Sequence, residues 1–296
     1  MARPAPRPTG RTEWLTDRAL RGYAVLAYLF LFLPIVVVIV FSFNAGRHAA
    51  ELVGLSTRWY EAAWSNVFVI KALGNSLTIA AATALLATIL GTTSALAMGS
   101  AGGRLRTLFE QLTYVAIIVP GIVIGIAALL FLVTVFGWLN PWLAFGFGAG
   151  APRFGLGAHS VVVMHTLFTM AIVNVIVRTR LRGMDRSLVE ASGDLYATPW
   201  RTFRQITFPQ ILPAIVAGGL LAFTFSFDDF IVAFFTAGQD QTLPIYLFSS
   251  IRRGVTPEAN AIATVLLATT VGSMAVMGLL LRRGRARPRA DTPDVG

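Results

Sequence analysis

Six long apolar runs constrain the fold of this chain of 296 residues more than any other feature. Each approaches or exceeds the roughly 20 residues that an α-helix needs to cross about 30 Å of hydrocarbon. The runs are Tyr23–Phe43, Asn75–Met98, Leu112–Gly137, Ala158–Val177, Ile211–Thr236 and Ala259–Leu281. A transmembrane β-barrel would show alternating segments of roughly 10 residues instead. The sequence therefore predicts an all-α membrane protein with six transmembrane helices.

The composition is also typical of a membrane protein. Only 13% of the residues are charged, against about 25% in soluble domains. The first apolar run follows several arginines, as in a secretory signal, but it is longer than the usual core of roughly 7–15 residues. We expect it to be a retained anchor. The sequence has no cysteine, which excludes disulfides and thiolate metal sites, and we expect neither a metal nor a cofactor.

The net charge of +10 is explained by where the arginines lie. They precede the first run, lie between the second and third, gather between the fourth and fifth, and follow the sixth. Because cytoplasmic segments of membrane proteins carry an excess of Lys and Arg, this alternation predicts that both termini are cytoplasmic. We expect a multi-pass membrane protein with no nucleic-acid partner.

The chain divides into three parts on this interpretation. Residues 1–22 form a cytoplasmic tail, 23–281 a six-span domain, and 282–296 a second cytoplasmic tail. Within the third run, Pro120 and Gly121 predict a kink or a break in the helix. Residues 44–74 and 138–157 are expected to be outside loops.

The segment at about 187–209, between the fourth and fifth runs, is polar and aromatic. Ser187 followed by Glu190 fits a capping box, which predicts a helix from about residue 188. Thr198 followed by Pro199 predicts the start of a second short helix.

An apolar stripe marks one side of that second helix. Trp200, Phe203 and Ile206 recur at three-residue spacing, and we expect Pro209 and Pro213 to end the helix before the fifth run. A pair of short helices with an aromatic side needs either a protein partner or the lipid surface. The residues alone leave both alternatives open.

Catalytic motifs are absent from the sequence. A phosphate-binding loop requires a lysine after a glycine-rich run, and the only lysine is Lys71, in "VFVIKALG". The three histidines are scattered, and no G-x-S-x-G motif occurs. An intramembrane hydrolase that uses His165 and a serine is a weaker alternative to a packing or hydrogen-bonding role for His165.

Asp228 and Asp229 are the one pair of formal charges within an apolar run. Ionisable groups inside a membrane are costly, and they commonly face a water-filled path or a partner. One hypothesis is that the pair lines a substrate path. The other is a structural role near the outer end of the fifth span, where Arg252 or Arg253 would pair with it.

Several stretches together resemble one family. Glu190-Ala191-Ser192 followed by Ile206-Thr207-Phe208-Pro209 resembles the cytoplasmic "EAA…G…IxLP" loop of permease subunits of binding-protein-dependent ABC importers. "SFDDFIVAFFTAG" (226–238), "LPIYLFSSIRRGVTPEANAIAT" (243–264) and "LSTRWYEAAW" (55–64) are similar to the spermidine/putrescine branch of that family. That branch also includes importers of opines, phosphonates and other solutes.

The resemblance implies a function and a set of partners. The loop would form coupling helices that dock on a pair of separate ATP-binding subunits, through Glu190, Ala191, Ser192, Tyr196, Ile206 and Pro209. A second permease subunit would complete the pore, and an extracytoplasmic solute-binding protein would deliver the solute. This chain departs from the family pattern at Ser192, where alanine is usual, and at Tyr196, where glycine is usual. A self-sufficient secondary transporter is the main alternative.

Overall fold

The computed structural model describes residues 10–47, 51–100, 102–254 and 256–285. The described residues divide into two compact units, one within 1–63 and 250–264 and the other within 64–249 and 265–296. Within the described residues the chain is helical apart from its connections and one isolated β-bridge, between Asn44 and Leu55. The all-α prediction is confirmed.

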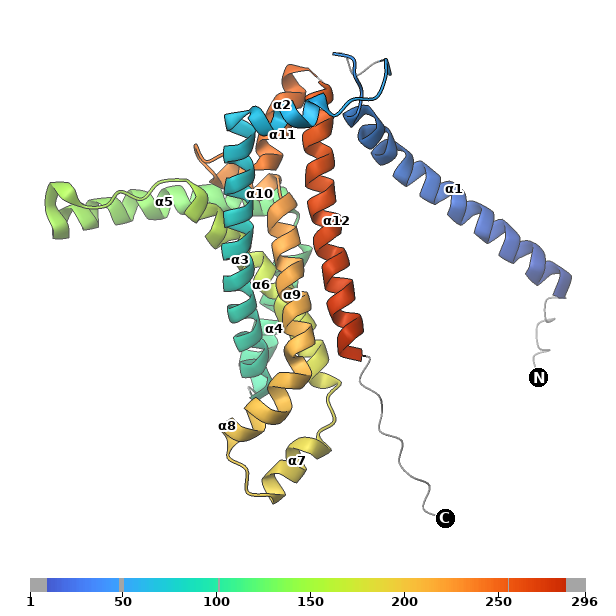
Figure 1. Cartoon of the computed structure of the whole chain (residues 1–296). Coiled ribbons are helices and arrows are strands. Elements are labelled where there is room, and N and C mark those ends of the chain that lie inside the picture. The colour runs from blue at the N-terminus through green and yellow to red at the C-terminus, as the bar shows by residue number, and fades with distance from the viewer. Residues whose placement is uncertain (1–9, 48–50, 101, 255, 286–296) are drawn as a thin grey trace, which may run out of the picture. The chain divides into compact units, whose positions relative to one another are not determined.

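The elements follow one another along the chain as Figure 1 shows them. They are α1 (Gly10–Ser42), α2 (Arg58–Ser65), α3 (Val67–Ser100), α4 (Gly103–Ile118), α5 (Gly121–Phe147), the 3-10 turn η1 (Gly148–Gly150), α6 (Ala158–Arg182), α7 (Ser187–Asp194), α8 (Pro199–Thr202), the π-helical turn η2 (Phe203–Thr207), α9 (Phe208–Asp228), α10 (Ile231–Thr236), α11 (Leu243–Arg253) and α12 (Pro257–Arg285).

Six of these helical stretches are long and apolar enough to cross a membrane, as the sequence predicts. They are Thr16–Ser42, Val67–Gly99, Gly121–Phe147, Ala158–Arg182, Pro199–Asp228 and Pro257–Leu279. The bounds differ from the predicted ones at both tails. Helix α1 begins at Gly10, within the expected tail of residues 1–22, and α12 continues to Arg285. The rest of the two tails, 1–9 and 286–296, lies outside the described residues.

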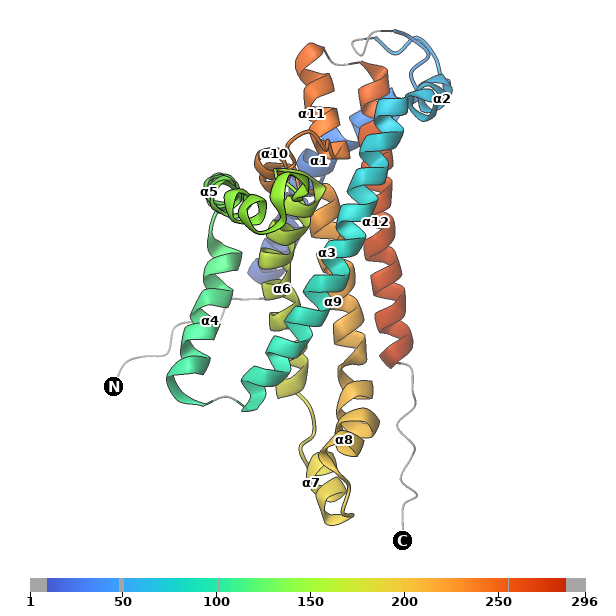
Figure 2. The same ribbon diagram turned by 90° about the vertical axis from the view of Figure 1, so that its left-hand side faces the viewer.

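The larger unit is built around three helices that run side by side, α3, α6 and α9 (Figures 1 and 2). Small residues let them approach closely, as is common between membrane helices. A β-carbon at Gly91 of α3 would lie 2.7 Å from the carbonyl oxygen of Met170 in α6, and one at Gly219 of α9 would lie 2.7 Å from the hydroxyl of Thr88. The core between the three helices contains Val173 and other small apolar side chains.

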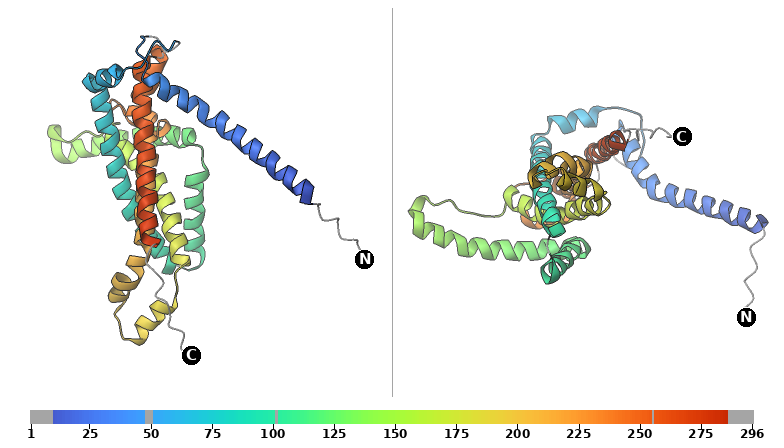
Figure 3. Two further views of the ribbon diagram at one scale, coloured as in Figure 1. Left: turned by 45° about the vertical axis from the view of Figure 1, so that its right-hand side comes forward. Right: turned by 90° about the horizontal axis from the view of Figure 1, so that it is seen from below.

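The third apolar run is two helices instead of one. Helix α4 ends at Ile118 and α5 begins at Gly121, because Pro120 has no N–H to donate to the preceding turn. The predicted break is confirmed. The predicted loop 138–157 is partly wrong, because α5 continues to Phe147. The helix ends there because Gly148 takes a φ of 74°. Helix α4 runs alongside α6, whereas α5 lies across the direction of α3, α6 and α9 (Figures 2 and 3).

The smaller unit is fixed by Asn44, which follows α1. Its side chain donates to the carbonyl oxygen of Glu51 at 2.7 Å and accepts from the N–H groups of Gly46 and Val53 at 3.1 Å. The indole of Trp59 donates to the carbonyl oxygen of Asn44 at 2.8 Å. The aromatic residue Trp59, in the expected outside loop 44–74, is thereby tied to the end of α1.

Candidate functional site

The connection between α6 and α9 forms two short helices at one end of the bundle, and α10 lies at the other end of α9 (Figure 1). Helix α7 begins at Ser187, one residue before the predicted start. The predicted capping box is wrong, because Asp185 provides the cap and its carboxylate accepts the N–H of Ser187 at 2.9 Å. Hydrogen bonds from the side chain and the backbone of Ser187 lower the pKa of Asp185. Glu190 and Ala191 are exposed on α7.

Helix α7 ends in a Schellman motif centred on Tyr196. The N–H of Ala197 donates to the carbonyl oxygen of Ser192 at 3.0 Å, and the N–H of Tyr196 donates to that of Gly193 at 2.9 Å. This motif requires a left-handed residue after the C-cap, where glycine is usual. Tyr196 takes that conformation with a φ of 57°, at the position where the resembled family has glycine.

The second short helix begins as predicted. Thr198 is its N-cap and accepts the N–H of Arg201 at 3.4 Å, and Pro199 occupies the first turn. The two short helices are joined by a hydrogen bond of 2.9 Å between the hydroxyls of Ser192 and Thr202. Ser192 is 7% exposed, so this residue, where the family usually has alanine, packs inside the loop.

The predicted end of this helix at Pro209 is wrong. Helix α8 continues through the π turn η2 into α9, and these elements form one helical stretch from Pro199 to Asp228. The N–H of Phe208 donates five residues back to the carbonyl oxygen of Phe203. This wide turn gives the chain room to pass Pro209, which has no N–H to donate. Ile206 is half-buried in the turn, Pro209 is exposed, and Pro213 lies inside α9.

The outer end of the loop carries three large exposed side chains, Leu195, Tyr196 and Trp200, which we name the loop surface. They are 81%, 95% and 67% exposed, respectively. The ring of Trp200 stacks on Phe203 with centroids 5.6 Å apart, so two residues of the stripe predicted from sequence contact each other. Exposed aromatic groups are typical of a surface that binds a partner.

Asp228 and Asp229 lie at a break between helices, and not within a continuous fifth span as predicted. Helix α9 ends at Asp228, and α10 begins at Ile231. One carboxylate oxygen of Asp229 accepts the N–H groups of Val232 and Ala233, at 2.9 and 3.1 Å, and so caps α10. Arg252 and Arg253 belong to the other compact unit, so their pairing with the aspartates stays a prediction.

His165, in α6, lies close to the carboxylate of Asp229. Its ring is fully buried, Nδ1 lies 2.8 Å from the hydroxyl of Ser226, and Nε2 lies 3.3 Å from Oδ2 of Asp229. The ring is hydrogen-bonded to Ser226, whereas Nε2 has no hydrogen-bond partner among the described residues, so its approach to Asp229 is a close contact. Ser226 is 4% exposed, so its hydroxyl meets no substrate, and the three groups form a structural network instead of a hydrolase site.

Asp229 also lines a cavity of about 230 Å³ between α4, α5, α6 and α9. Phe168 of α6 and Phe225 of α9 are also in the lining, and the remaining lining is aliphatic. A carboxylate beside aromatic rings fits an alkylammonium group, since the charge pairs with the carboxylate and the ring faces attract cations. Asp228 is exposed at the end of α9.

The structure thus brings the predicted site residues together as two groups. The loop residues lie at one end of the bundle, and the aspartates lie roughly 30 Å away at the far end of α9, since each helical residue rises 1.5 Å. The sequence did not indicate the hydrogen bond of Thr202 with Ser192. It also did not indicate the contact between His165 and Ser226, two residues that are 61 positions apart. Among the described residues no group of three His, Cys, Asp or Glu side chains could hold a metal ion.

The chain matches the model of a known protein family. The model of the family described as "Binding-protein-dependent transport system inner membrane component" matches residues 87–287, which include the loop, the aspartates and the cavity.

Curated relatives match over nearly the whole chain. The Putrescine transport system permease protein PotI of Escherichia coli (strain K12) is 38% identical over 275 residues, covering 92% of this chain and 91% of the relative. The Spermidine/putrescine transport system permease protein PotC of Escherichia coli (strain K12) is 33% identical over 283 residues, covering 95% of this chain and 100% of the relative.

Solved structures share the fold. A chain of a bacterial ABC transporter that imports the acidic polysaccharide alginate has a TM-score of 0.71 at 14% identity, covering 93% of this chain and 96% of that one. A chain of an amino acid ABC transporter has a TM-score of 0.51 at 19% identity, covering 76% of this chain and 95% of that one.

Proposed function

The chain belongs to the family of binding-protein-dependent transport system inner membrane components, and we propose that its substrate is a polyamine such as putrescine or spermidine. It is a multi-pass inner-membrane permease subunit of an ABC importer, and ATP hydrolysis takes place on a separate subunit. It forms half of the pore. The observation that carries the substrate assignment is the carboxylate of Asp229 in a cavity with two aromatic rings.

The chemistry of that cavity supports a cationic substrate. An ammonium group that has lost part of its water gains a charge-assisted hydrogen bond to the carboxylate and a favourable contact with Phe168 or Phe225. A single carboxylate binds weakly enough for the substrate to leave again, which transport requires. The names of the relatives PotI and PotC, which refer to putrescine and spermidine, agree with this assignment.

The loop surface is the proposed contact with the ATPase. Leu195, Tyr196 and Trp200 are exposed, and Glu190 is exposed on the first loop helix. Docking of this surface on a pair of ATP-binding subunits would transmit their closure through the continuous stretch Pro199–Asp228 to Asp229. This explains in physical terms why a chain without a phosphate-binding loop takes part in ATP-driven transport.

The remaining partners and the orientation are also proposals. A second, related permease subunit would complete the pore, and an extracytoplasmic solute-binding protein would deliver the polyamine. The proposed domain division is a six-span domain with short cytoplasmic ends, with both termini and the loop at about 187–209 inside. The arginines near the loop, among them Arg178, Arg182 and Arg201, support this orientation.

Cysteine labelling tests the orientation, because the chain has no native cysteine. Ser192 is buried and therefore a poor position for a label, whereas Tyr196 is exposed. We expect a cysteine at Tyr196 or Gly102 to react with an impermeant reagent only after permeabilisation, and one at Gln239 to react from outside. Labelling of Tyr196→Cys in intact cells would contradict the loop assignment.

Uptake in vesicles tests the transport function. We expect radiolabelled putrescine to enter vesicles only when the ATP-binding subunits, the second permease, the binding protein and ATP are all present. A self-sufficient secondary transporter would instead move putrescine without ATP, driven by an ion gradient. ATP-driven uptake of an uncharged solute with no uptake of putrescine would contradict the polyamine assignment alone.

A further inference from the structure

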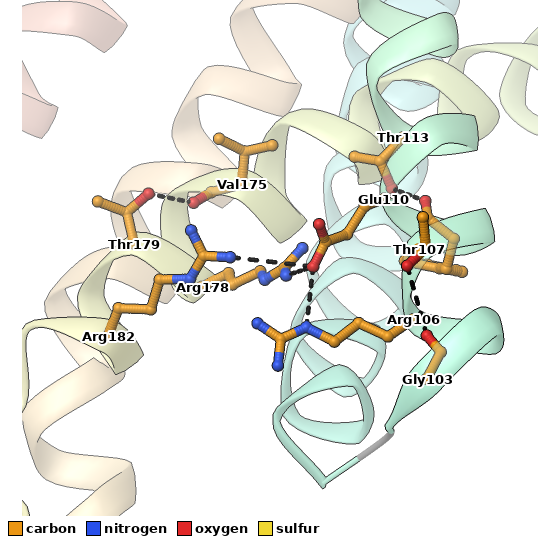
Figure 4. Close-up of polar contacts among 10 residues, drawn as sticks. Gly103, Arg106, Thr107, Glu110, Thr113, Val175, Arg178, Thr179 and Arg182 are labelled. Atoms are coloured by element: carbon orange, nitrogen blue, oxygen red, sulfur yellow. Dashed lines mark hydrogen bonds and ion pairs between the residues drawn. The ribbon is translucent and has the colours of Figure 1, made fainter.

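Three arginines converge on one carboxylate where α4 and α6 meet (Figure 4). Nε of Arg106 lies 2.9 Å from Oε1 of Glu110, Arg182 reaches the same oxygen at 3.9 Å, and Arg178 pairs with it as well. The cluster therefore carries more positive than negative charge. Guanidinium groups gathered so closely repel one another, and an anion that binds among them relieves that repulsion.

A second cavity, of about 390 Å³, lies next to this cluster between α3, α4 and α6. Its walls are apolar, with Leu112, Leu167 and Met170 among them, and its amide Asn174 is bonded to Ser94 at 2.8 Å. The cluster adjoins residues of the cavity lining along both helices. Phe109, in the cavity wall, precedes Glu110 directly, and Arg178 follows Asn174 by one helical turn.

We propose that this arrangement binds one anionic phospholipid, with the phosphate on the arginines and an acyl chain in the cavity. The guanidinium fork of arginine matches phosphate oxygens in a bidentate geometry. Basic residues at the edge of a membrane attract anionic lipids, and an apolar wall beside them suits the hydrocarbon chain. The inference is independent of the polyamine assignment.

The exposed fractions of the arginines indicate which of them meet the phosphate. The side chains of Arg106 and Arg182 are 44% and 60% exposed, whereas that of Arg178 is only 12% exposed. Arg178 therefore holds Glu110 and ties α4 to α6. Among the described residues, Arg106 and Arg182 contact only Glu110, so further N–H donors at the surface can reach a headgroup without displacing Glu110.

The two cavities differ in the charge of their surroundings and therefore favour ligands of opposite charge. They share Ala116, Val119, Ile124 and Phe168 as a common wall. The smaller cavity has the carboxylate of Asp229 in its lining, which favours a cation. The larger cavity adjoins an excess of positive charge, which repels a polyamine and attracts an anion.

Lipid retention in the full-length chain tests the proposal. The test variant is Arg106→Gln with Arg182→Gln. The matched control is Arg104→Gln with Arg180→Gln, which removes the same charge from the same two helices; Arg180 donates to the carbonyl oxygen of Gln210 instead of Glu110. Each protein is reconstituted in vesicles with equal amounts of phosphatidylglycerol and phosphatidylcholine and extracted in detergent. Native mass spectrometry then measures the lipid that each protein retains.

We expect the parent and the control to retain phosphatidylglycerol in preference to phosphatidylcholine. In the test variant we expect retention of phosphatidylglycerol to fall at least about fivefold, because the headgroup loses its two direct arginine contacts and one such contact is worth about that factor. Equal retention by the test variant and the control would overturn the proposal, and so would equal retention of the two lipids by the parent. A free anion is a different outcome. If millimolar inorganic phosphate raises the thermal stability of the parent as much as phosphatidylglycerol does, the lipid assignment is wrong.

Discussion

The backbone N–H of Tyr196 donates to the carbonyl oxygen of Gly193 at 2.9 Å, and this bond closes the last turn of α7. The bond requires Tyr196 to hold a φ of 57°. An L-residue with a β-carbon pays about 1–2 kcal/mol for that conformation. The loop therefore keeps a turn that suits glycine while presenting an aromatic ring at its tip.

Substitution of Tyr196 tests this turn. Tyr196→Gly removes the steric cost, so we expect the loop to resist protease in inside-out vesicles at least as well as the parent does. Tyr196→Val places a β-branched residue at positive φ, and we expect cleavage between residues 187 and 202 to become severalfold faster. A valine variant as resistant as the parent would show that the turn does not depend on this backbone conformation.

Close packing of α3 against α6 predicts a position-specific effect of one methyl group. A β-carbon at Gly91 would lie 2.7 Å from both the carbonyl oxygen of Met170 and the side chain of Val173, whereas one at Gly74 meets nothing within 4 Å. We expect Gly91→Ala to destabilise the purified chain by about 1–3 kcal/mol. Gly74→Ala, in the same helix, is the control and should leave the thermal midpoint unchanged or raised. Equal midpoints for the two variants would contradict the packing.

The two aspartates are expected to differ in their contribution to uptake. Asp229→Asn keeps an oxygen to cap α10 but removes the charge from the cavity, so we expect putrescine uptake to fall severalfold with normal assembly. Asp228 is exposed at the end of α9, and Asp228→Asn should have the smaller effect. Parental uptake by both variants would exclude the path-lining role. A loss of assembly that Arg252→Gln reproduces would favour the structural pairing.

Local signals in the sequence predicted the elements that depend on a few neighbouring residues. Thr198 with Pro199 marked the start of α8, and Pro120 marked the break before α5, because both effects act through the nearest backbone groups. The six spans were predicted because length and apolarity decide them. The residues themselves indicated the loop at about 187–209 and its two short helices, whereas the family resemblance pointed to its role in binding an ATPase.

Three features of the structure were not predicted from the sequence. The π turn before Pro209 keeps the helix continuous where proline alone indicates an end. Asp229 caps α10 and lies close to His165. In the sequence these residues appear only as part of an acidic pair and as an isolated histidine. Tyr196 looked like a departure from the family, but its backbone conformation is the one that glycine would take.

ATP-driven uptake by Glu190→Arg, measured together with ATP hydrolysis, tests the central claim most directly. That claim is that the loop couples a separate ATPase to this permease. The assay uses vesicles that contain the permease, its partners and putrescine, with Glu51→Arg as a control reversal at an exposed residue outside the loop. We predict that Glu190→Arg inserts normally but loses uptake, either because the ATPase no longer binds or because it hydrolyses ATP without transport. Parental uptake and hydrolysis in the Glu190→Arg vesicles would contradict the account.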